Sequence, residues 1–585
     1  MSQSGRDWAG VVLTLIAFVV GLSDAARGEE YRRHAVVSQQ GDASNAGRDV
    51  LRDGGTAVDA AIATAFALAV THPAAGNLGG GGFLVAYDAK TRRVTTFDFR
   101  ETAPAASTPT MYLGPDGKLL KGHRVGPRDA GVPGTVRGLG LAHSRLGRLE
   151  WGRLVRPAAK LARDGFEVSE TLARGLNGQL FDPKSVDVAS VPEDLGDPVD
   201  RLAQFPASVA AYRKPDGTPW KAGDRLVQPD LARTLERIAQ EGPDEFYTGE
   251  TARLVAEYCA GSGGLITRAD LAAYRAIERE PVKGTFRGRE VYGMGPPASG
   301  GILIAEMLQI LERYDLKASG PSSPKTLHLV TEVMRRAYFT RATRIADPDV
   351  VAVPTAELAS RPFADALAAT ITDRATPSAS LAPFPIETPE GSHTTHLSTI
   401  DGEGSAVALT YTLEEGYGSK AVVPGAGFLL NNEMGDFNLI PGRTDTTGRI
   451  GTEPNRIAPG KRMLSSQAPT IVLEGGKVRL VTGSPGGRTI PNTTLWVILY
   501  ALEFGLSPRE SVDGLRTHHA WFPDVLAMEG KAWDEATLDA LRAMGHTLRV
   551  GGIQGDAHTI VVDPATGTIH GVADLRRKTS RPSGD

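Results

Sequence analysis

Apolar and polar positions in the N-terminal part of the chain predict a strand followed by two helices. Residues 35–38, with the sequence Ala-Val-Val-Ser, predict a short strand. Residues 43–52 follow a helical pattern that ends at Gly54-Gly55, a typical signal of a helix C-terminus. Residues 56–70 are rich in alanine and almost free of charge. This second helix is therefore predicted to be buried on most sides.

The C-terminal third has the pattern of strands and hairpins. The segments "SAVALTYTL", "TIVLEGGKVRLVT" and "TIVVDPATGTIHGVAD" are rich in β-branched residues and have Gly-Gly or Thr-Gly near their turns. Residues 130–290 instead predict mainly helices, and residues 493–504 predict a further helix between strands. Runs of strands alternating with runs of helices favour a layered α+β fold. No Pro/Ser-rich linker divides the chain into independent domains.

The glycine run in "GNLGGGGFLVAYD", residues 76–88, is a candidate phosphate-binding loop. It lacks the Lys-Ser/Thr that follows the glycines of a P-loop, and no strand immediately precedes it. We interpret it as a tight passage into a buried strand. A second segment, residues 438–461, has no predicted helix or strand, and a loop of this length in a compact protein is often a functional lid.

Composition excludes several classes of protein. Across 585 residues, 41% are hydrophobic and 23% are charged, as in an ordinary globular protein. The net charge of −4 and the lack of a basic stripe give no indication of nucleic-acid binding. The glycines and prolines are scattered and not periodic, which excludes a collagen-like chain.

Residues 1–25 predict a secretory signal peptide. Arg6 precedes an apolar run that is too short to span a bilayer comfortably, and Ser23-Asp24-Ala25 fits a small-x-small cleavage signal. Cleavage is predicted after Ala25. An uncleaved anchor is the alternative, because this region has a single basic residue. Either way the body of the protein is expected outside the cytoplasm, periplasmic or secreted, without stable membrane association.

The single cysteine, Cys259, excludes an intrachain disulfide. An exported chain without disulfides requires a core large enough to stabilise it, and 585 residues provide one.

The stretch "GSHTTHLSTIDGEGSAVALTYTLEEGYGS", residues 391–419, predicts a hairpin with strands over 395–400 and 405–413. If residue 400 pairs with 405, Thr394 lies opposite residue 411, and Thr412 is one step away. The two threonines are then expected at the same end of the hairpin.

A threonine hydroxyl becomes a useful nucleophile when the α-amino group of the same residue activates it. At Thr394 this requires a chain break after His393. The alternative is that Thr394-Thr395 is simply strand material, since β-branched residues favour strands. His393 and His396 are poor candidates for metal ligands, because no third ligand stands at a useful spacing.

Several motifs together resemble the γ-glutamyltranspeptidase family of N-terminal-nucleophile hydrolases. They are "TTHLSTID", "AVALTYTLEEGYGS", "GFLLNNEMGDFN", "PGKRMLSSQAPTIV" and "GSPGG", with "GNLGGGGF", "FDFRETAP", "GVPGTV" and "HHAWFPD" elsewhere. The resemblance spans nearly the whole chain. It implies an α+β fold, a four-layer αββα sandwich formed by two fragments of one self-cleaved precursor. The fragments would be a large subunit, residues 26–393, and a small subunit, residues 394–585.

The resemblance also implies an activity. Thr394 would cut the chain at His393-Thr394, and would then cleave the γ-glutamyl amide of glutathione and related compounds through an acyl-enzyme. Water or an amino acid or dipeptide acceptor would release the glutamyl group. Thr412 matches the hydroxyl that supports the nucleophile in this family. The two subunits would form a heterodimer, and no metal or cofactor is implied.

The family pattern assigns the remaining site residues in three groups. Arg100 would bind the substrate α-carboxylate with the hydroxyls of Ser465 and Ser466, an acidic trio would bind the α-ammonium group, and two glycine amides would stabilise the oxyanion. The trio is Glu414, Glu433 and Asp436, and the glycines are Gly486 and Gly487. Three carboxylates around one ammonium group repel each other, so at least one pKa in the trio is expected to be raised.

Without the resemblance, each group has a simpler interpretation. Arg100 would be a surface salt-bridge partner of Glu101. Glu414-Glu415 would be a solvated pair, and Gly486-Gly487 an ordinary turn.

Two positions depart from the family pattern. Thr447 stands where some members have an aromatic residue on the lid loop, which suggests a wetter site and favours hydrolysis over transfer. Gly435 replaces an acid beside Asp436, which bears on substrate affinity more than on reaction type.

The sequence leaves two alternative functions. A related glutaryl-type (cephalosporin) acylase is disfavoured by the intact acidic trio, because a glutaryl group has no ammonium group to hold. An unprocessed, non-catalytic binding protein is disfavoured by Thr394, Thr412 and the Gly486-Gly487 pair.

Overall fold

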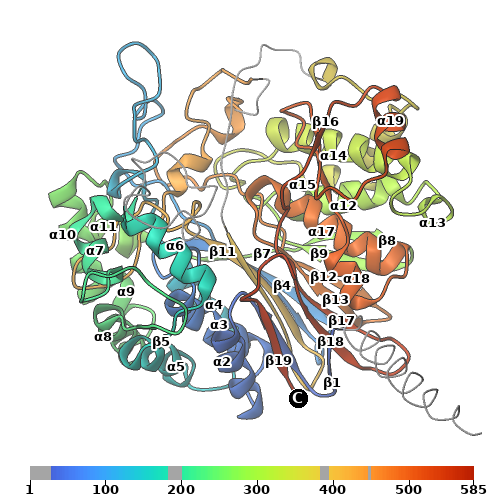
Figure 1. Ribbon diagram of the computed structural model, residues 1–585. Coiled ribbons are helices and arrows are strands. Elements are labelled where there is room, and N and C mark those ends of the chain that lie inside the picture. The colour runs from blue at the N-terminus through green and yellow to red at the C-terminus, as the bar shows by residue number, and fades with distance from the viewer. Residues whose placement is uncertain (1–27, 182–200, 382–393, 446–449) are drawn as a thin grey trace, which may run out of the picture.

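Two β-sheets lie face to face and helices cover the outer face of each (Figure 1). The computed structural model describes residues 28–181, 201–381, 394–445 and 450–585. Within these residues the protein is a four-layer αββα sandwich, which confirms the predicted α+β class.

The first sheet has seven strands and is assembled from both ends and the middle of the chain. Its order is β19 (Arg581–Gly584), β2 (Ala35–Ser38), β10 (Thr395–Ile400), β11 (Ala406–Thr412), β3 (Gly81–Asp88), β4 (Arg93–Phe99) and β7 (Ile277–Arg279). Every neighbouring pair is antiparallel. The strand that begins at Thr395 therefore lies inside the sheet, between β2 and β11.

The second sheet also has seven strands and is antiparallel throughout. Its order is β1 (Glu29–Tyr31), β18 (Ile569–Ala573), β17 (His558–Val562), β13 (Lys477–Thr482), β12 (Thr470–Glu474), β9 (Arg289–Gly293) and β8 (Val282–Phe286). Two small sheets add β5 (Phe166–Glu167) with β6 (Arg225–Leu226), and β14 (Thr517–His518) with β15 (Leu526–Met528) and β16 (Leu548–Val550).

Apolar side chains fill the space between the two large sheets. Phe83, Val85 and Ala408 of the first sheet belong to one buried cluster with Ile471 and Val481 of the second. The opposite face of the first sheet packs against helices, so all seven residues of β11 are buried. This burial on both faces explains why "AVALTYT" is a nearly continuous apolar run and not an alternating one.

Helices of the N-terminal half cover the first sheet. They are α2 (Gly41–Arg52), α3 (Ala57–Thr71), α4 (Thr135–Leu146), α5 (Trp151–Asp164), α6 (Glu170–Leu180), α7 (Pro206–Tyr212), α8 (Pro229–Glu241), α9 (Glu245–Thr248), α10 (Glu250–Ser262) and α11 (Arg268–Ala273). Every residue of α3 is buried, as the alanine-rich pattern predicts. Thr56 and Asp59 form a capping box that fixes its first turn.

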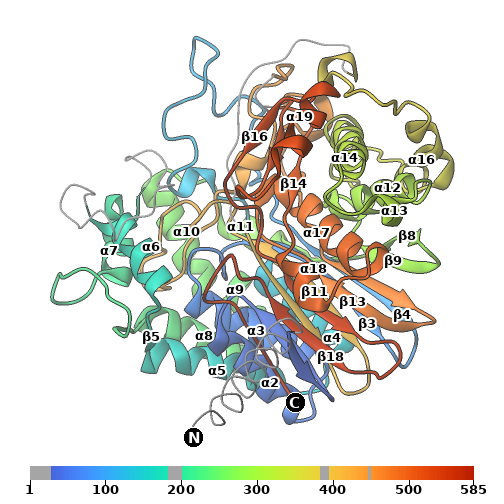
Figure 2. The same cartoon turned by 45° about the vertical axis from the view of Figure 1, so that its right-hand side comes forward.

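The second sheet is covered by helices from the middle and the end of the chain, seen turned forward in Figure 2. They are α12 (Gly300–Leu311), α13 (Leu316–Ser319), α14 (Pro324–Arg344), α15 (Thr355–Leu358), α16 (Arg361–Ala368), α17 (Ile490–Ile498), α18 (Pro508–Asp513) and α19 (Glu535–Ala543). The helix predicted over 493–504 is present as α17, which begins earlier and continues as a π-helical turn over Leu499–Glu503.

The glycine run is a close-packed passage into β3, as interpreted from the sequence. A Cβ atom at Gly80 would lie 1.9 Å from the Thr412 carbonyl oxygen, and one at Gly79 would lie 2.2 Å from the Leu429 carbonyl oxygen. Only glycine allows this approach, because such distances are far below van der Waals contact. The run thus positions the end of β11.

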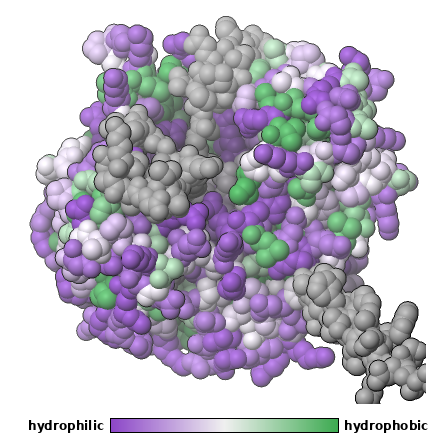
Figure 3. All heavy atoms as spheres, viewed as in Figure 1, coloured by the Kyte–Doolittle hydropathy of each residue, from purple (hydrophilic) through white to green (hydrophobic). Residues whose placement is uncertain are grey.

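Among the described residues, no helix combines the length and the apolar character needed to cross a bilayer. The face shown in Figure 3 is dominated by hydrophilic residues, with hydrophobic ones scattered across it.

A buried carboxyl group between α12 and α14 makes stability depend on pH. Burial raises the pKa of Glu306 to about 8, which the nearby Thr340, Arg336 and Arg344 only partly offset. The folded state therefore keeps a proton on Glu306 that the unfolded state loses near pH 4.5. As a result, the free energy of unfolding falls as the pH rises from about 4.5 to about 8. We expect Glu306→Gln to remove this loss. At pH 8 the free energy of unfolding should be higher than in the wild type by roughly 4 kcal/mol.

Urea unfolding of Glu306→Gln and wild type at pH 5 and pH 8 measures this effect. At pH 5 the two proteins should be nearly equal. An equal difference at both pH values would contradict a raised pKa at Glu306.

Candidate active site

The hairpin that carries the two threonines has a register one residue different from the predicted one. Ile400 lies opposite Ala406, and Thr395 lies opposite Tyr411. The predicted pairing of residue 400 with 405 is wrong because Ser405 belongs to the turn. Its carbonyl accepts the Asp401 amide at 2.9 Å, and its own amide donates to Asp401 Oδ1 at 3.0 Å. Continued by one residue, the observed register places Thr394 opposite Thr412.

A pocket at this end of the hairpin brings the predicted site residues together. Its cavity volume is about 30 Å³, room for one or two water molecules. It is lined by Arg100, Arg341, Thr394, Thr412, Glu414, Glu433, Asp436, Ser465, Ser466, Gln467, Gly487, Arg488 and Ile490. Of the predicted residues, Gly486 directly precedes one that lines the pocket, and His393 lies outside the described residues.

The end of β11 is held by the glycine run. The Asn77 side-chain amide donates to the Thr412 carbonyl at 2.9 Å, and its side-chain oxygen accepts the Gly80 amide at 3.0 Å. The Thr412 hydroxyl accepts the Glu414 amide at 2.8 Å.

Arg100 is fully buried and directly follows β4. The alternative interpretation, in which Arg100 forms a surface salt bridge with Glu101, is therefore wrong. Its guanidinium contacts Glu433 at 2.6 Å and Glu101 at 3.5 Å, and also contacts Asp436. The Tyr274 hydroxyl donates to its carbonyl at 2.8 Å. Glu101 is nevertheless a partner of Arg100, in the interior of the protein.

The carboxylates around Arg100 change each other's protonation. Burial raises the pKa of Glu433 well above its usual value; the Arg100 charge opposes this rise, and the negative charges of Glu101, Asp436 and Glu414 add to it. Burial likewise raises the pKa of Glu101 to about 8. The predicted rise within the acidic trio is confirmed at Glu433. A bound ammonium group would favour ionisation of these carboxyls.

Glu414 is not part of a solvated pair. Its side chain is buried and its backbone has a φ of +79°, a left-handed conformation that is uncommon for residues other than glycine. Arg124 contacts Glu414 at 3.5 Å and Glu415 at 2.8 Å. The turn directs Glu414 into the pocket, since it is one of the lining residues.

The two predicted serine donors stand on a fixed loop. The Ser465 amide donates to the Pro297 carbonyl at 2.9 Å, and the Ser465 carbonyl accepts from the amide and the hydroxyl of Ser299 at 2.8 and 2.7 Å. Both Ser465 and Ser466 are buried and line the pocket.

Gly486 and Gly487 require glycine for backbone reasons. Their φ values are +128° and +54°. A Cβ atom at Gly486 would lie 2.4 Å from Thr489 Oγ1, which donates to the Gly486 carbonyl at 2.8 Å. The pair therefore forms a tight, partly buried turn beside the pocket, in which the Thr489 amide donates to the Gly486 carbonyl at 3.0 Å.

His396 is part of the interior of the sandwich. Its Nδ1 lies 2.7 Å from Thr410 Oγ1 and its Nε2 lies 3.1 Å from Ser398 Oγ. Burial and the neighbouring His558 hold the pKa of His396 well below its usual value. With both ring nitrogens hydrogen-bonded, His396 fits a structural role and not that of a metal ligand.

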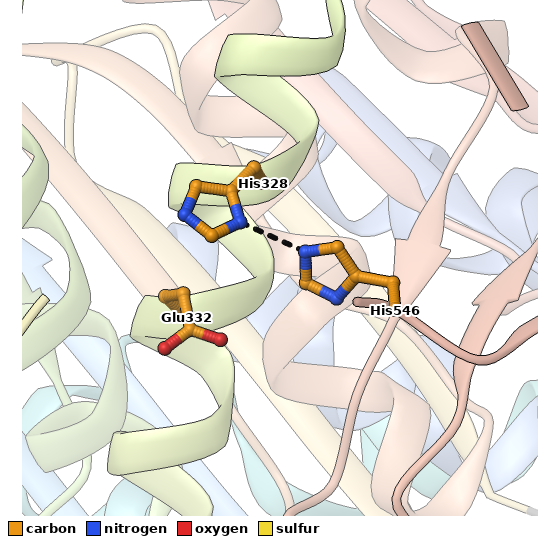
Figure 4. A group of neighbouring side chains, drawn as sticks. All are labelled: His328, Glu332 and His546. Carbon is orange, nitrogen blue, oxygen red and sulfur yellow. Dashed lines mark hydrogen bonds between the residues drawn. The ribbon is translucent and has the colours of Figure 1, made fainter. Parts of the chain in front are cut away.

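A second histidine cluster lies outside the pocket. His328 and Glu332 on α14 lie beside His546, and their potential ligand atoms are within 4.8 Å of one another (Figure 4). His328 Nε2 donates to the Thr372 carbonyl at 2.8 Å, so its Nδ1 accepts from His546 Nε2 at 2.8 Å. Glu332 contacts Arg336 at 2.7 Å. These bonds attach the segment around Thr372 to α14.

Four lining residues were not predicted, namely Arg341, Gln467, Arg488 and Ile490. Gln467 directly follows the predicted Ser465-Ser466, and Arg488 directly follows Gly487, so closeness to the motifs was the available signal. Arg341 lies on α14, far from every motif in the sequence. The predicted lid residue Thr447 lies outside the described residues. Gly435 is buried beside Asp436, with Arg124 near the position of its missing side chain.

A four-layer αββα sandwich in which an inner strand begins beside a threonine-containing pocket defines an N-terminal-nucleophile hydrolase fold. Comparison with solved structures agrees. The crystal structure of a cephalosporin acylase from Bacillus halodurans matches with a TM-score of 0.80 over 95% of this chain and 97% of that chain, at 24% identity. The γ-glutamyltranspeptidase of Helicobacter pylori is 37% identical, with a TM-score of 0.54 over 59% of this chain and 93% of that chain.

Sequence comparison gives the family. The family model described as Gamma-glutamyltranspeptidase matches residues 43–582. The glutathione hydrolase proenzyme of Escherichia coli (strain K12) is 42% identical over 547 residues, which cover 92% of this chain and 90% of the relative. The acylase ACY 1 proenzyme of Pseudomonas sp. (strain SE83) is 35% identical over 93% of this chain and 92% of the relative. The chain belongs to the γ-glutamyltranspeptidase family.

Proposed function

We propose that this protein is a γ-glutamyl hydrolase/transferase that cleaves the γ-glutamyl amide of glutathione and related compounds. The pocket carries this proposal, because it places Thr394 beside an arginine, two serine hydroxyls and three carboxylates. A γ-glutamyl group ends in a free α-carboxylate and a free α-ammonium group. Arg100 with Ser465 and Ser466 fits the carboxylate, and Glu414, Glu433 and Asp436 fit the ammonium group.

The chemistry proceeds through an ester on Thr394. The free α-amino group of Thr394 takes the proton of its own hydroxyl, and Oγ attacks the γ-carbonyl carbon of the donor. The amides of Gly486 and Gly487 stabilise the oxyanion, and Thr412 supports the nucleophile through its hydroxyl. The amide C–N bond then breaks, and the proton passes to the leaving amine. Water or an acceptor amine attacks the ester and releases the glutamyl group.

The free amino group requires a cut between His393 and Thr394. Thr394 Oγ attacks the preceding carbonyl, the peptide bond shifts to an ester, and water opens it. The mature protein is then a heterodimer of residues 26–393 and 394–585, after loss of residues 1–25 on export to the periplasm or the medium. Relatives named as proenzymes support a processed two-subunit precursor.

Hydrolysis of matched anilides separates this activity from that of a glutaryl-type acylase; one relative is named an acylase. Glutaryl-4-nitroanilide differs from γ-glutamyl-4-nitroanilide only by lacking the α-amino group. Because three carboxylates line the pocket, we expect kcat/KM to be at least about 100-fold higher for the γ-glutamyl compound. Equal values, or a preference for glutaryl, would make the protein an acylase.

Gly486→Ala tests the oxyanion position. The new methyl group would meet Thr489 Oγ1 and displace the amides from their geometry. We expect kcat to fall by about 100-fold with a much smaller change in KM. Gly475→Ala is a matched control, because Gly475 also has a positive φ, +59°, but faces open space. An activity loss no larger in Gly486→Ala than in this control would remove Gly486 from the mechanism.

A further inference from the structure

The two peptide units that carry the proposed oxyanion amides are each held at their carbonyl oxygen. The Gly486 N–H belongs to the same planar unit as the Pro485 carbonyl, and the Gly487 N–H to the same unit as the Gly486 carbonyl. Both units are trans. In a trans unit the carbonyl and the N–H point in opposite directions. A hydrogen bond that fixes the carbonyl therefore fixes the direction of the N–H as well.

Thr489 holds the Gly486 carbonyl. Its hydroxyl donates to this oxygen at 2.8 Å, and its backbone amide donates to the same oxygen at 3.0 Å. Thr489 directly precedes α17, whose nine residues are all buried. The carbonyl is thus attached to the start of a buried helix, and the Gly487 N–H is directed away from it.

Ser484 holds the Pro485 carbonyl in the same way. Its hydroxyl donates to this oxygen at 2.6 Å and accepts the Asp556 amide at 2.8 Å. A hydroxyl has a single hydrogen, so accepting from Asp556 leaves that hydrogen for the Pro485 carbonyl. Ser484 and Asp556 are both fully buried. The direction of the Gly486 N–H therefore depends on a buried pair of hydrogen bonds.

The support of Ser484 continues to the sheet that carries the nucleophile. The side-chain amide of Gln39 donates to Asp556 Oδ2 at 2.5 Å. Gln39 directly follows β2, and β2 pairs with β10, where Ser38 lies opposite Leu397. Since β10 begins one residue after Thr394, buried hydrogen bonds connect the oxyanion loop with the nucleophile strand.

We propose that Ser484 and Thr489 are positioning residues, which orient the Gly486 and Gly487 amides toward the oxyanion. The proposal rests on the proposed γ-glutamyl chemistry and adds two residues to it. Glycine has wide conformational freedom, so the amides of this pair need to be fixed by contacts from outside. Neither hydroxyl residue is among the described residues that line the pocket. They act on the reaction through the backbone and not by touching the substrate.

Thr489→Val and Thr489→Ser test the first hydroxyl with γ-glutamyl-4-nitroanilide. Valine keeps the shape of the side chain but cannot donate to the Gly486 carbonyl. Removing an oxyanion donor costs about 100-fold or more in kcat, and loosening one should cost less. We expect Thr489→Val to lower kcat about tenfold with KM nearly unchanged, and Thr489→Ser to restore kcat to within about twofold of the wild type. The kcat values are expressed per cleaved chain, measured on a denaturing gel.

Thr343→Val is the matched control, because it removes a hydroxyl that donates to a carbonyl at the same distance. The Thr343 hydroxyl donates to the Phe339 carbonyl at 2.8 Å on α14. Its kcat and KM should equal those of the wild type.

Ser484→Ala tests the second hydroxyl and should also lower kcat about tenfold without raising KM. Should Ser484→Ala fail to fold, Ser484→Cys takes its place, since a thiol has a similar size but is a weak donor.

Other outcomes overturn the proposal. Wild-type kcat in Thr489→Val, or an equal loss in Thr489→Ser, excludes a role for the Thr489 hydroxyl. A rise in KM with unchanged kcat assigns either residue to substrate binding instead. Wild-type kcat in the Ser484 variant removes Ser484. Failure of the γ-glutamyl chemistry itself is distinguishable, because the wild type would then not hydrolyse the donor.

Discussion

Replacing Thr394 with alanine leaves one uncut chain without γ-glutamyl activity. In the proposed mechanism the same oxygen atom attacks the His393 carbonyl during maturation and the donor carbonyl during turnover. Removing it therefore blocks both steps, and activity should fall by at least about 1,000-fold. A denaturing gel of the purified protein and hydrolysis of γ-glutamyl-4-nitroanilide measure the two effects.

Two neighbouring substitutions are the controls. Thr394→Ser keeps the hydroxyl and should still be cut, at a lower rate. Thr395→Ala alters the next residue, whose hydroxyl lies 3.4 Å from Gln39 Oε1, and should mature and turn over. A Thr394→Ala protein that is cut at the same bond would show that another group performs the cleavage.

Replacing Arg100 with glutamine should have the second largest effect, on both activity and stability. Arg100 is buried against Glu433, Glu101 and Asp436. Loss of its charge leaves the buried Glu433 and Glu101, and the partly exposed Asp436, without their partner, which costs about 3–5 kcal/mol of unfolding free energy. The substrate carboxylate also loses its guanidinium partner, so kcat/KM should fall by about 100-fold or more.

Arg100→Lys separates the two roles. It keeps the positive charge among the carboxylates and should recover part of the stability, but it lacks the forked geometry and should remain poor in kcat/KM. Thermal unfolding and donor kinetics of Arg100→Lys, Arg100→Gln and a control, Arg268→Gln at an exposed position on α11, make the comparison. Wild-type kcat/KM in Arg100→Lys would mean that Arg100 does not bind the substrate carboxylate.

The elements of the fold could be predicted where local pattern determines them. The alanine-rich helix α3 and the strands around residues 395–412 follow from burial and β-branched residues. The hairpin register could not be predicted within one residue, because hydrogen bonds of Asp401 with Ser405 decide whether Ser405 joins the turn or the strand. These bonds depend on the geometry of the loop and leave no periodic signal.

The pocket residues divide in the same way. The pocket residues that lie within the family motifs, such as Arg100 and Gly487, could be predicted. Arg341 could not be predicted, because it lines the pocket only as a result of how α14 packs beside Arg488. The hydrogen bond from the Tyr338 hydroxyl to the Arg488 carbonyl is part of that packing. The complete burial of Glu101 was also not predicted, because a pair of charged residues after a strand is usually exposed to solvent.

N-terminal sequencing of every fragment of the purified protein tests the central claim most directly, because the chemistry requires a free amino group on Thr394. The predicted result is a small fragment that begins Thr-Thr-His-Leu and a large fragment that ends at His393. A folded protein that remains one intact chain, or that is cut at another bond, would contradict the account.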